Sequence, residues 1–156
     1  MEKFIEYLDS SARNLRTADH MAYVTYPLLK EKRILFEILN NIYTSVLNIV
    51  NAILQYEYFY KRISLYKESR DNLAVFKERC ASRYQISQDE ISKINELFSL
   101  IEKHKNSPFE FVRKDKIVIM GENLHTDFIN LEKIKAYLLL SKDVLRKAEV
   151  RIRGRI

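Results

Sequence analysis

The chain has 156 residues, with 27 lysine and arginine residues against 21 aspartate and glutamate residues, so its net charge is +6. One domain with a sizeable core is expected at this length, and the two glycines and two prolines favour long helices over turn-rich all-β folds and glycine-rich phosphate loops. Cys80 is the only cysteine, so an intrachain disulfide and a zinc site of paired cysteines are excluded.

The first predicted element is a helix from about Glu2 to Tyr23, whose apolar residues recur on one face. Its opening residues lack the basic stretch and apolar run of a secretory signal, so a cytoplasmic protein is expected. Asp19 falls within the apolar face, and we expect it either to be paired inside the bundle or to mark a site. Pro27 is expected to end this helix, because the residue before a proline is usually excluded from the α region.

A long second helix is predicted over about 28–66. Its centre, residues 38–56, has no charged side chain, but its amides are too polar for contact with lipid, so no membrane partner is expected. Five polar residues spaced three and four apart form a narrow amide stripe on this helix: Asn41, Thr44, Asn48, Asn51 and Gln55. We interpret the amide stripe as an interface between helices or between the two copies of a homodimer. The alternative is a groove that faces a ligand.

Aromatic and basic residues are interleaved at the end of this second helix. The segment contains Tyr58, Tyr60, Lys61 and Arg62 within five positions. Aromatic rings beside cations are what stacking on unpaired bases requires, so these four are candidate RNA-binding residues. Because the rings of this segment point all around the helix axis, the other interpretation is that most of them belong to the core.

Two shorter helical segments follow, then a segment in which apolar residues alternate as in a strand, and then a last helix. A third helix is predicted over about 70–84, and a fourth begins at a capping box formed by Ser87 and Glu90. Alternating residues then predict a β-hairpin over about 109–120, which must lie on the helices or pair with a second chain. A last helix covers about 130–149. The predicted fold is mainly α: an antiparallel four- or five-helix bundle with a small β-hairpin insertion.

Much of the excess positive charge lies near the C-terminus. We expect residues 1–150 to form a single helical-bundle domain and residues 151–156 to form a basic tail. A localised basic segment attracts polyanions, RNA first, and a solvated terminus is the alternative interpretation. The candidate phosphate contacts of this region are Arg146, Lys147, Arg151, Arg153 and Arg155.

Metal chemistry is not expected from the spacing of the histidines and acids. His125 lies two residues from Asp127, and His20 follows Asp19, but neither pair has the spacing of a helical His-x-x-x-His or Glu-x-x-His site. No serine or cysteine can be assigned a base that would activate it. No metal and no cofactor are therefore predicted.

Arg13, Asn14 and His20 form a pattern in which six residues separate the arginine from the histidine. This pattern resembles the Arg-x(4–6)-His motif of the HEPN superfamily, small helical-bundle proteins that are commonly dimeric, many of which cleave RNA without metal. The resemblance implies that His20 is the acid/base group in attack by the ribose 2′-hydroxyl, that Arg13 stabilises phosphate charge and that Asn14 assists. In that superfamily the motif usually lies late in the domain, whereas it falls in the first helix of this chain. A solvated helix face is the alternative interpretation.

One main functional prediction and two alternatives result. The main prediction is a non-enzymatic, homodimeric helical protein that binds RNA or a ribonucleoprotein, such as a ribosomal subunit, without sequence-specific binding of DNA. The first alternative is a HEPN-like, metal-independent ribonuclease or toxin that uses Arg13, Asn14 and His20. The second is a protein–protein interaction module that contacts no nucleic acid.

Overall fold

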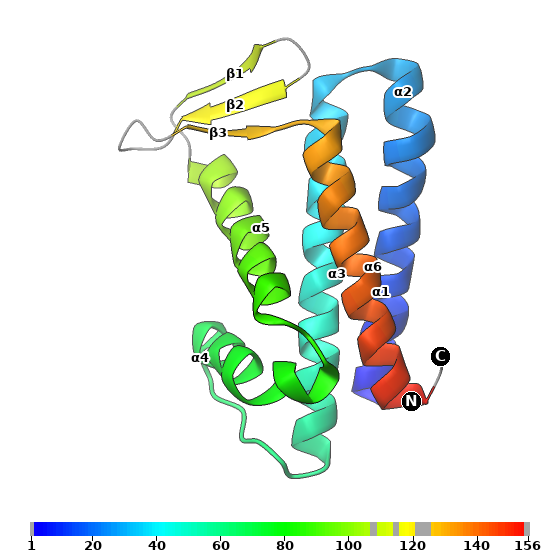
Figure 1. The fold of residues 1–156 in the computed structure, drawn as a ribbon, viewed down its shortest axis with the longest axis vertical. Helices are drawn as coiled ribbons and strands as arrows, with labels where there is room; N and C mark the ends of the chain where they lie inside the picture. The colour runs from blue at the N-terminus through cyan, green and yellow to red at the C-terminus, as the bar shows by residue number, and fades with distance from the viewer. Residues whose placement is uncertain (1, 107–108, 114–115, 121–125, 155–156) are drawn as a thin grey trace.

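The computed structural model describes residues 2–106, 109–113, 116–120 and 126–154. Within these ranges, long helices run alternately up and down to form a bundle, and a small sheet lies at one end of it (Figure 1). The elements in chain order are α1 (Lys3–His20), the π-helical turn η1 (Met21–Thr25), α2 (Tyr26–Leu29), α3 (Lys32–Phe59), α4 (Ser69–Val75), the π-helical turn η2 (Phe76–Cys80), the 3₁₀ turn η3 (Ala81–Tyr84), α5 (Gln88–Asn106), β1 (Phe109–Arg113), β2 (Lys116–Met120), β3 (Thr126–Ile129) and α6 (Leu131–Arg153). This arrangement confirms the predicted mainly α bundle with a β-hairpin insertion.

The first helix continues beyond Pro27, so the prediction that this proline ends it is wrong. Residues 21–25 form one wider π-helical turn, in which the N–H of Tyr26 donates to the carbonyl five residues earlier. Tyr26 keeps helical angles, φ −63° and ψ −46°, and Pro27 stands in the first turn of α2. A wide turn leaves room for a proline ring that would clash with the preceding turn of a regular α-helix. The helix ends just before the left-handed Lys30 (φ 52°).

α3 is the central helix of the bundle, and one broad face of it is buried. Several of its large apolar side chains have no exposed surface: Leu35, Ile38, Leu39, Ile42, Val46, Ile49 and Ile53. α1 approaches α3 closely at Ser11 and Ser45, whose buried hydroxyls are 2.7 Å apart. α3 ends at Phe59 rather than near residue 66, because Lys61 takes a left-handed conformation (φ 59°) that turns the chain. Within the described ranges, no helix combines the length and apolar character that crossing a membrane requires.

The predicted hairpin is the first part of a three-stranded antiparallel sheet with the order β1-β2-β3. In its register, Val118 of β2 pairs with Phe128 of β3. Ile117, Ile119 and Ile129 are buried in the same core as the helices, so the sheet lies on the bundle of its own chain. The sequence did not predict β3, because its four residues, TDFI, show no alternation of polar and apolar side chains.

α6 runs across the boundary that the sequence analysis placed at residue 150. Its start is capped by Asn130, whose side chain accepts a hydrogen bond from the N–H of Lys133 at 2.8 Å. Its end is capped by the left-handed Gly154 (φ 69°). Residues 151–153 are therefore part of the bundle, whereas residues 155–156 lie outside the described residues.

Candidate nucleic-acid interface

A pocket of about 610 Å³ lies at the end of the bundle where α1 begins and α3 ends. We call it the α1–α3 pocket, and its lining residues are Glu2, Lys3, Phe4, Gln55, Tyr58, Phe59, Lys61, Ile63 and Ser64. Phe4 and Ile63 are buried, whereas the rings of Tyr58 and Phe59 are 52% and 56% exposed. Exposed aromatic rings thus stand beside polar and charged groups in one concave surface.

The turn after α3 explains why these rings stay exposed. The N–H of Lys61 donates to the carbonyl of Tyr58, and the N–H of Arg62 donates to that of Glu57, each at 2.9 Å. This is the hydrogen-bond pattern of a Schellman motif, in which the left-handed position is usually a glycine and is Lys61 in this chain. The motif turns the chain back at once, so that Ile63 becomes buried while the last turn of α3 stays uncovered.

Tyr60 and Arg62, two of the predicted RNA-binding residues, are packed into a cluster of rings. Tyr60 contacts Tyr56 and Phe59 edge-to-face, with ring centroids 4.9 Å and 5.1 Å apart. The guanidinium of Arg62 lies over the rings of Tyr56 and Tyr60, 5.5 Å and 5.1 Å from their centroids. Tyr58 makes no ring contact in the described part of the chain. Of the two predicted tyrosines, Tyr58 is therefore the one whose ring is free to stack on a ligand.

Arg62 is also held by a buried acid. The carboxylate of Glu57 is completely buried, and it lies 2.6 Å from Nε of Arg62 and 3.3 Å from Nη1 of Arg83. The hydrogen bond with Glu57 raises the pKa of Arg62. A buried carboxylate requires such partners, and the charge of Arg62 is largely neutralised within the chain. Of the four residues predicted at this end of α3, Tyr58 and Lys61 are the two that face the pocket.

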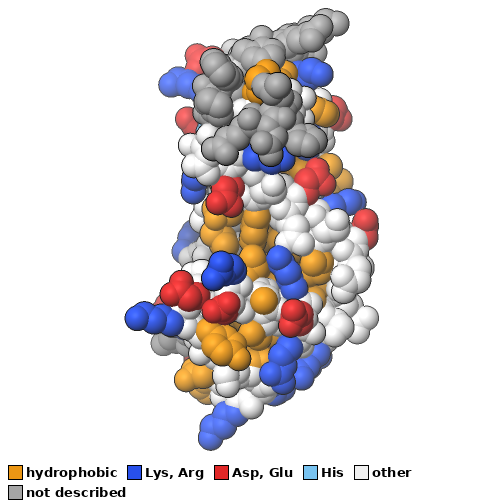
Figure 2. Space-filling model, turned by 90° about the vertical axis from the view of Figure 1, so that its left-hand side faces the viewer, with side chains coloured by type: hydrophobic (Ala, Val, Ile, Leu, Met, Phe, Trp, Pro, Cys, Tyr) orange, Lys and Arg blue, Asp and Glu red, His pale blue; other side chains and the backbone are white. Residues whose placement is uncertain are grey.

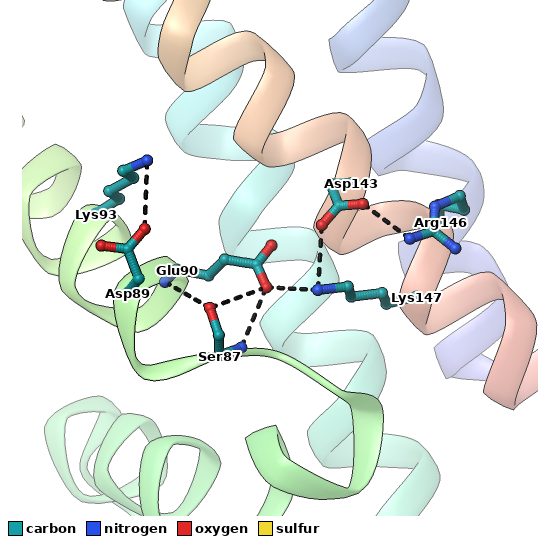
Figure 3. A network of polar contacts seen from close by, with 7 residues as sticks. All are labelled: Ser87, Asp89, Glu90, Lys93, Asp143, Arg146 and Lys147. Atoms are coloured by element: carbon teal, nitrogen blue, oxygen red, sulfur yellow. Dashed lines mark hydrogen bonds and ion pairs between the residues drawn. The ribbon is translucent and has the colours of Figure 1, made fainter.

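The predicted phosphate contacts Arg146 and Lys147 are paired with acids of the bundle. Nζ of Lys147 lies 2.5 Å from Glu90 of α5 and 3.1 Å from Asp143, and Arg146 contacts Asp143 at 2.8 Å (Figure 3). The hydrogen bond from Arg146 is the main cause that lowers the pKa of Asp143 to about 2. Burial opposes the charge on Lys147, but the two carboxylates together raise its pKa. These contacts fasten α6 to the start of α5.

Arg151 and Arg153 contact their own chain as well. Arg153 is 13% exposed and lies 2.5 Å from the carboxylate of Asp9 in α1. Arg151 lies over the ring of the buried Tyr84, 5.3 Å from its centroid. Arg155 falls outside the described residues. Arg153 thus joins α6 to α1 and its charge is compensated, whereas Arg151 contacts a ring and the carbonyl of Arg83 and has no acidic partner among the described residues.

The structure places Arg13, Asn14 and His20 in three different environments. Arg13 is exposed and donates to a serine hydroxyl one turn earlier at 3.0 Å. Asn14 accepts a hydrogen bond from Asn48 of α3 at 3.0 Å and so joins two helices. His20 lies two helical turns beyond Arg13, about 10 Å along the axis, in a groove that it shares with Arg16. Arg16 was not among the predicted site residues, although its i,i+4 spacing to His20 places both on one face.

The amide stripe of α3 contributes to contacts within one chain. Asn48 donates to α1, and the amide nitrogen of Asn41 lies 3.9 Å from the sulfur of Met21. Asn51 is half-buried, and Gln55 lines the α1–α3 pocket. The stripe therefore joins α3 to the first helix in its upper part and supplies a polar group to a concave surface in its lower part.

Metal ligands do not gather in the described part of the chain, where no three histidine, cysteine, aspartate or glutamate side chains could hold a metal ion together. Of the pair His125 and Asp127, which the sequence did not favour as a metal site, His125 lies outside the described residues and Asp127 pairs with Lys103 at 2.5 Å. Comparison of the chain with protein-family models, with curated proteins and with solved structures found no significant match. The α1–α3 pocket is the concave surface in which the exposed rings of Tyr58 and Phe59 lie beside Lys3 and Lys61.

Proposed function

We propose that this protein binds single-stranded RNA, free or within a ribonucleoprotein such as a ribosomal subunit, and does not cleave it. The observation that carries the proposal is the α1–α3 pocket, in which Tyr58 and Phe59 are more than half exposed beside Lys3 and Lys61. Neither lysine has an ion-pair partner among the described residues. Exposed rings beside lysines that form no ion pair are the combination that single-stranded nucleic acids require.

Each part of the α1–α3 pocket matches one part of a nucleotide. Stacking of a base on an aromatic ring contributes about 1–3 kcal/mol, and Tyr58 offers a ring that no other ring covers. The amide of Gln55 and the hydroxyl of Ser64 can donate and accept hydrogen bonds at a base edge. Lys3 and Lys61 are exposed, where they would meet phosphates. A single strand is favoured over a duplex because the faces of paired bases are already stacked.

The charge around the α1–α3 pocket supports the same proposal. Residues 61–83, which follow α3, hold seven lysine and arginine residues and three aspartate and glutamate residues, and two of the arginines, Arg62 and Arg83, are paired with Glu57. On the face that carries α4 and α5, apolar side chains reach the surface among charged ones, and basic side chains lie at the lower end (Figure 2). An excess of positive charge in the segment that follows α3 favours the approach of a polyanion.

Fluorescence anisotropy with a labelled oligouridylate tests the stacking role of Tyr58. We expect Tyr58→Ala to lower the affinity about tenfold, which corresponds to the loss of one stacked base. Tyr66→Ala is the matched control, because Tyr66 is 57% exposed but does not line the pocket. Equal losses in both variants would mean that binding does not use the α1–α3 pocket.

Lys61 can be tested with a control of the same backbone geometry. Lys61 and Lys30 are both left-handed lysines, with φ 59° and φ 52°, so glycine replaces either without backbone strain. If Lys61 contacts a phosphate, Lys61→Gly should reduce the slope of log affinity against log salt by about 0.7, and Lys30→Gly should leave it unchanged. An oligouridylate that does not bind the wild-type protein at low salt contradicts the proposal.

The ribonuclease alternative predicts a different result in the same experiment. Under that alternative the labelled RNA is shortened in the presence of EDTA, and His20→Ala stops the cleavage while the protein stays folded. Under our proposal the RNA stays intact in both proteins. Homodimer formation and a cytoplasmic location stay predictions, and light scattering of the purified protein measures the first of them.

A further inference from the structure

A second concave surface, with a volume of about 750 Å³, lies between the first and the last helix. We call it the α1–α6 groove, and it runs between residues 12–24 of the first helix and residues 142–149 of α6. Twelve residues of helix span about 18 Å, so the groove is long enough for an extended chain molecule. It is separate from the α1–α3 pocket, with which it shares no lining residue.

The base of the α1–α6 groove is apolar. Ala12, Leu15 and Leu145 line it, and Leu15 is buried. Tyr23 and Val24 form one end and remain 53% and 43% exposed, although both are apolar enough to favour burial. The ammonium of Lys135 lies 4.8 Å from the centroid of the Tyr23 ring and holds it in place. The groove thus has an apolar base and an apolar end that the chain itself leaves partly uncovered.

The charged side chains of the groove leave an excess of positive charge. Most of them are paired within the chain: Asp19 with Lys142 at 2.5 Å, Arg146 with Asp143 at 2.8 Å, and Glu149 with Arg153 at 3.1 Å. Arg16 and His20 have no hydrogen-bond or ion-pair partner in the part of the chain that the structure describes. They stand one turn apart on the same helix, so one guanidinium and one imidazole face the groove together.

We propose that the α1–α6 groove binds an amphipathic anion, with its apolar chain along Leu15 and Leu145 and its carboxylate or phosphate at Arg16 and His20. Arg16 supplies the ionic contact, and its planar guanidinium matches the two oxygens of such a head group. His20 donates a hydrogen bond to the same head group. A cationic amphiphile is not expected to bind, because the unpaired charge in the groove, that of Arg16, is positive. This inference does not rest on the binding of RNA.

Four probes that differ only in their head groups test the proposal: decanoate, decyl phosphate, decanol and decyltrimethylammonium. Each is titrated below its micellar concentration into ¹⁵N-labelled full-length protein, and dissociation constants are taken from amide chemical shifts. A hydrogen bond to a charged group contributes about 1.5–3 kcal/mol. We therefore expect at least one of the two anions to bind at least about tenfold more tightly than decanol. The stronger of the two anions identifies the head group. The shifts should lie in residues 12–24 and 142–149.

Two arginines of α1 provide a matched pair of variants. Arg16→Gln should reduce the affinity for the anion to that of decanol, whereas Arg13→Gln, outside the groove on the same helix, should leave it within twofold. Ala12→Phe should block all four probes by filling the base of the groove. The proposal is overturned if decanol binds as tightly as both anions, if no probe binds, or if Arg13→Gln weakens binding as much as Arg16→Gln. A dimer of the wild-type protein that Ala12→Phe separates would also overturn it, because a second copy would then occupy the groove.

Discussion

Replacing the buried Glu57 with glutamine should destabilise the turn that shapes the α1–α3 pocket. The exchange keeps the shape of the side chain but removes a charge whose oxygens accept hydrogen bonds from Arg62 at 2.6 Å and Arg83 at 3.3 Å. A hydrogen bond to a charged group contributes about 1.5–3 kcal/mol. Both arginine side chains are 36% exposed, so water can replace part of the hydrogen bonding that they lose with the carboxylate. We expect the free energy of unfolding to fall by about 2–4 kcal/mol.

Equilibrium unfolding in urea, followed by far-ultraviolet circular dichroism, measures this change. The matched control is Glu37→Gln, which alters an exposed glutamate of the same helix and should change the free energy of unfolding by less than about 0.5 kcal/mol. If Glu57→Gln changes it as little as the control does, then the contacts of Glu57 with Arg62 and Arg83 do not anchor the end of α3.

Four further predictions concern stability and reactivity. Lys30→Gly and Lys61→Gly each relieve a left-handed residue and should raise the free energy of unfolding in urea by about 1 kcal/mol; a decrease would contradict this. Arg153→Gln removes the contact with Asp9 and should lower the free energy of unfolding by about 1–2 kcal/mol, whereas no change would make Arg153 a solvated tail residue. Cys80 is completely buried, so a thiol reagent should label the native protein only as fast as local or global unfolding exposes the Cys80 thiol. Burial raises the pKa of the Cys80 thiol to about 11, so the unfolded chain ionises first, and stability should fall between about pH 9 and 11 more steeply than in Cys80→Ala.

Local signals in the sequence predicted local structure, but partners far away in the chain left no signal. Ser87 and Glu90 form the expected capping box, with reciprocal hydrogen bonds of 3.1 Å between the N–H of each residue and the side chain of the other (Figure 3). The same carboxylate of Glu90 also holds Lys147 of α6 at 2.5 Å, which no periodic pattern could indicate. The prediction that Pro27 ends the first helix failed for a related reason: no residue pattern in the sequence indicates a π-helical turn.

The candidate site was predictable in its residue types but not in its geometry. The rings and cations near the end of α3 were evident from the residue types in the sequence. Which of them stay uncovered depends on the left-handed turn at Lys61 and on Phe4, at the start of α1, which lines the same pocket. The α1–α6 groove depends on contacts such as that of Asp19 with Lys142, 123 residues later. Asp19 fell on the apolar face in sequence because it stands at the edge of this groove, where it is paired and 42% exposed.

Photocrosslinking to a single-stranded RNA that contains 4-thiouridine, followed by mass spectrometry of the crosslinked peptides, tests the binding of RNA at the α1–α3 pocket most directly. We predict that the crosslinks concentrate on Tyr58 and Phe59 at the end of α3, and that excess unlabelled oligouridylate removes them. Crosslinks that map mainly to the basic residues of α6, or RNA that forms no competed crosslink at all, would contradict the account.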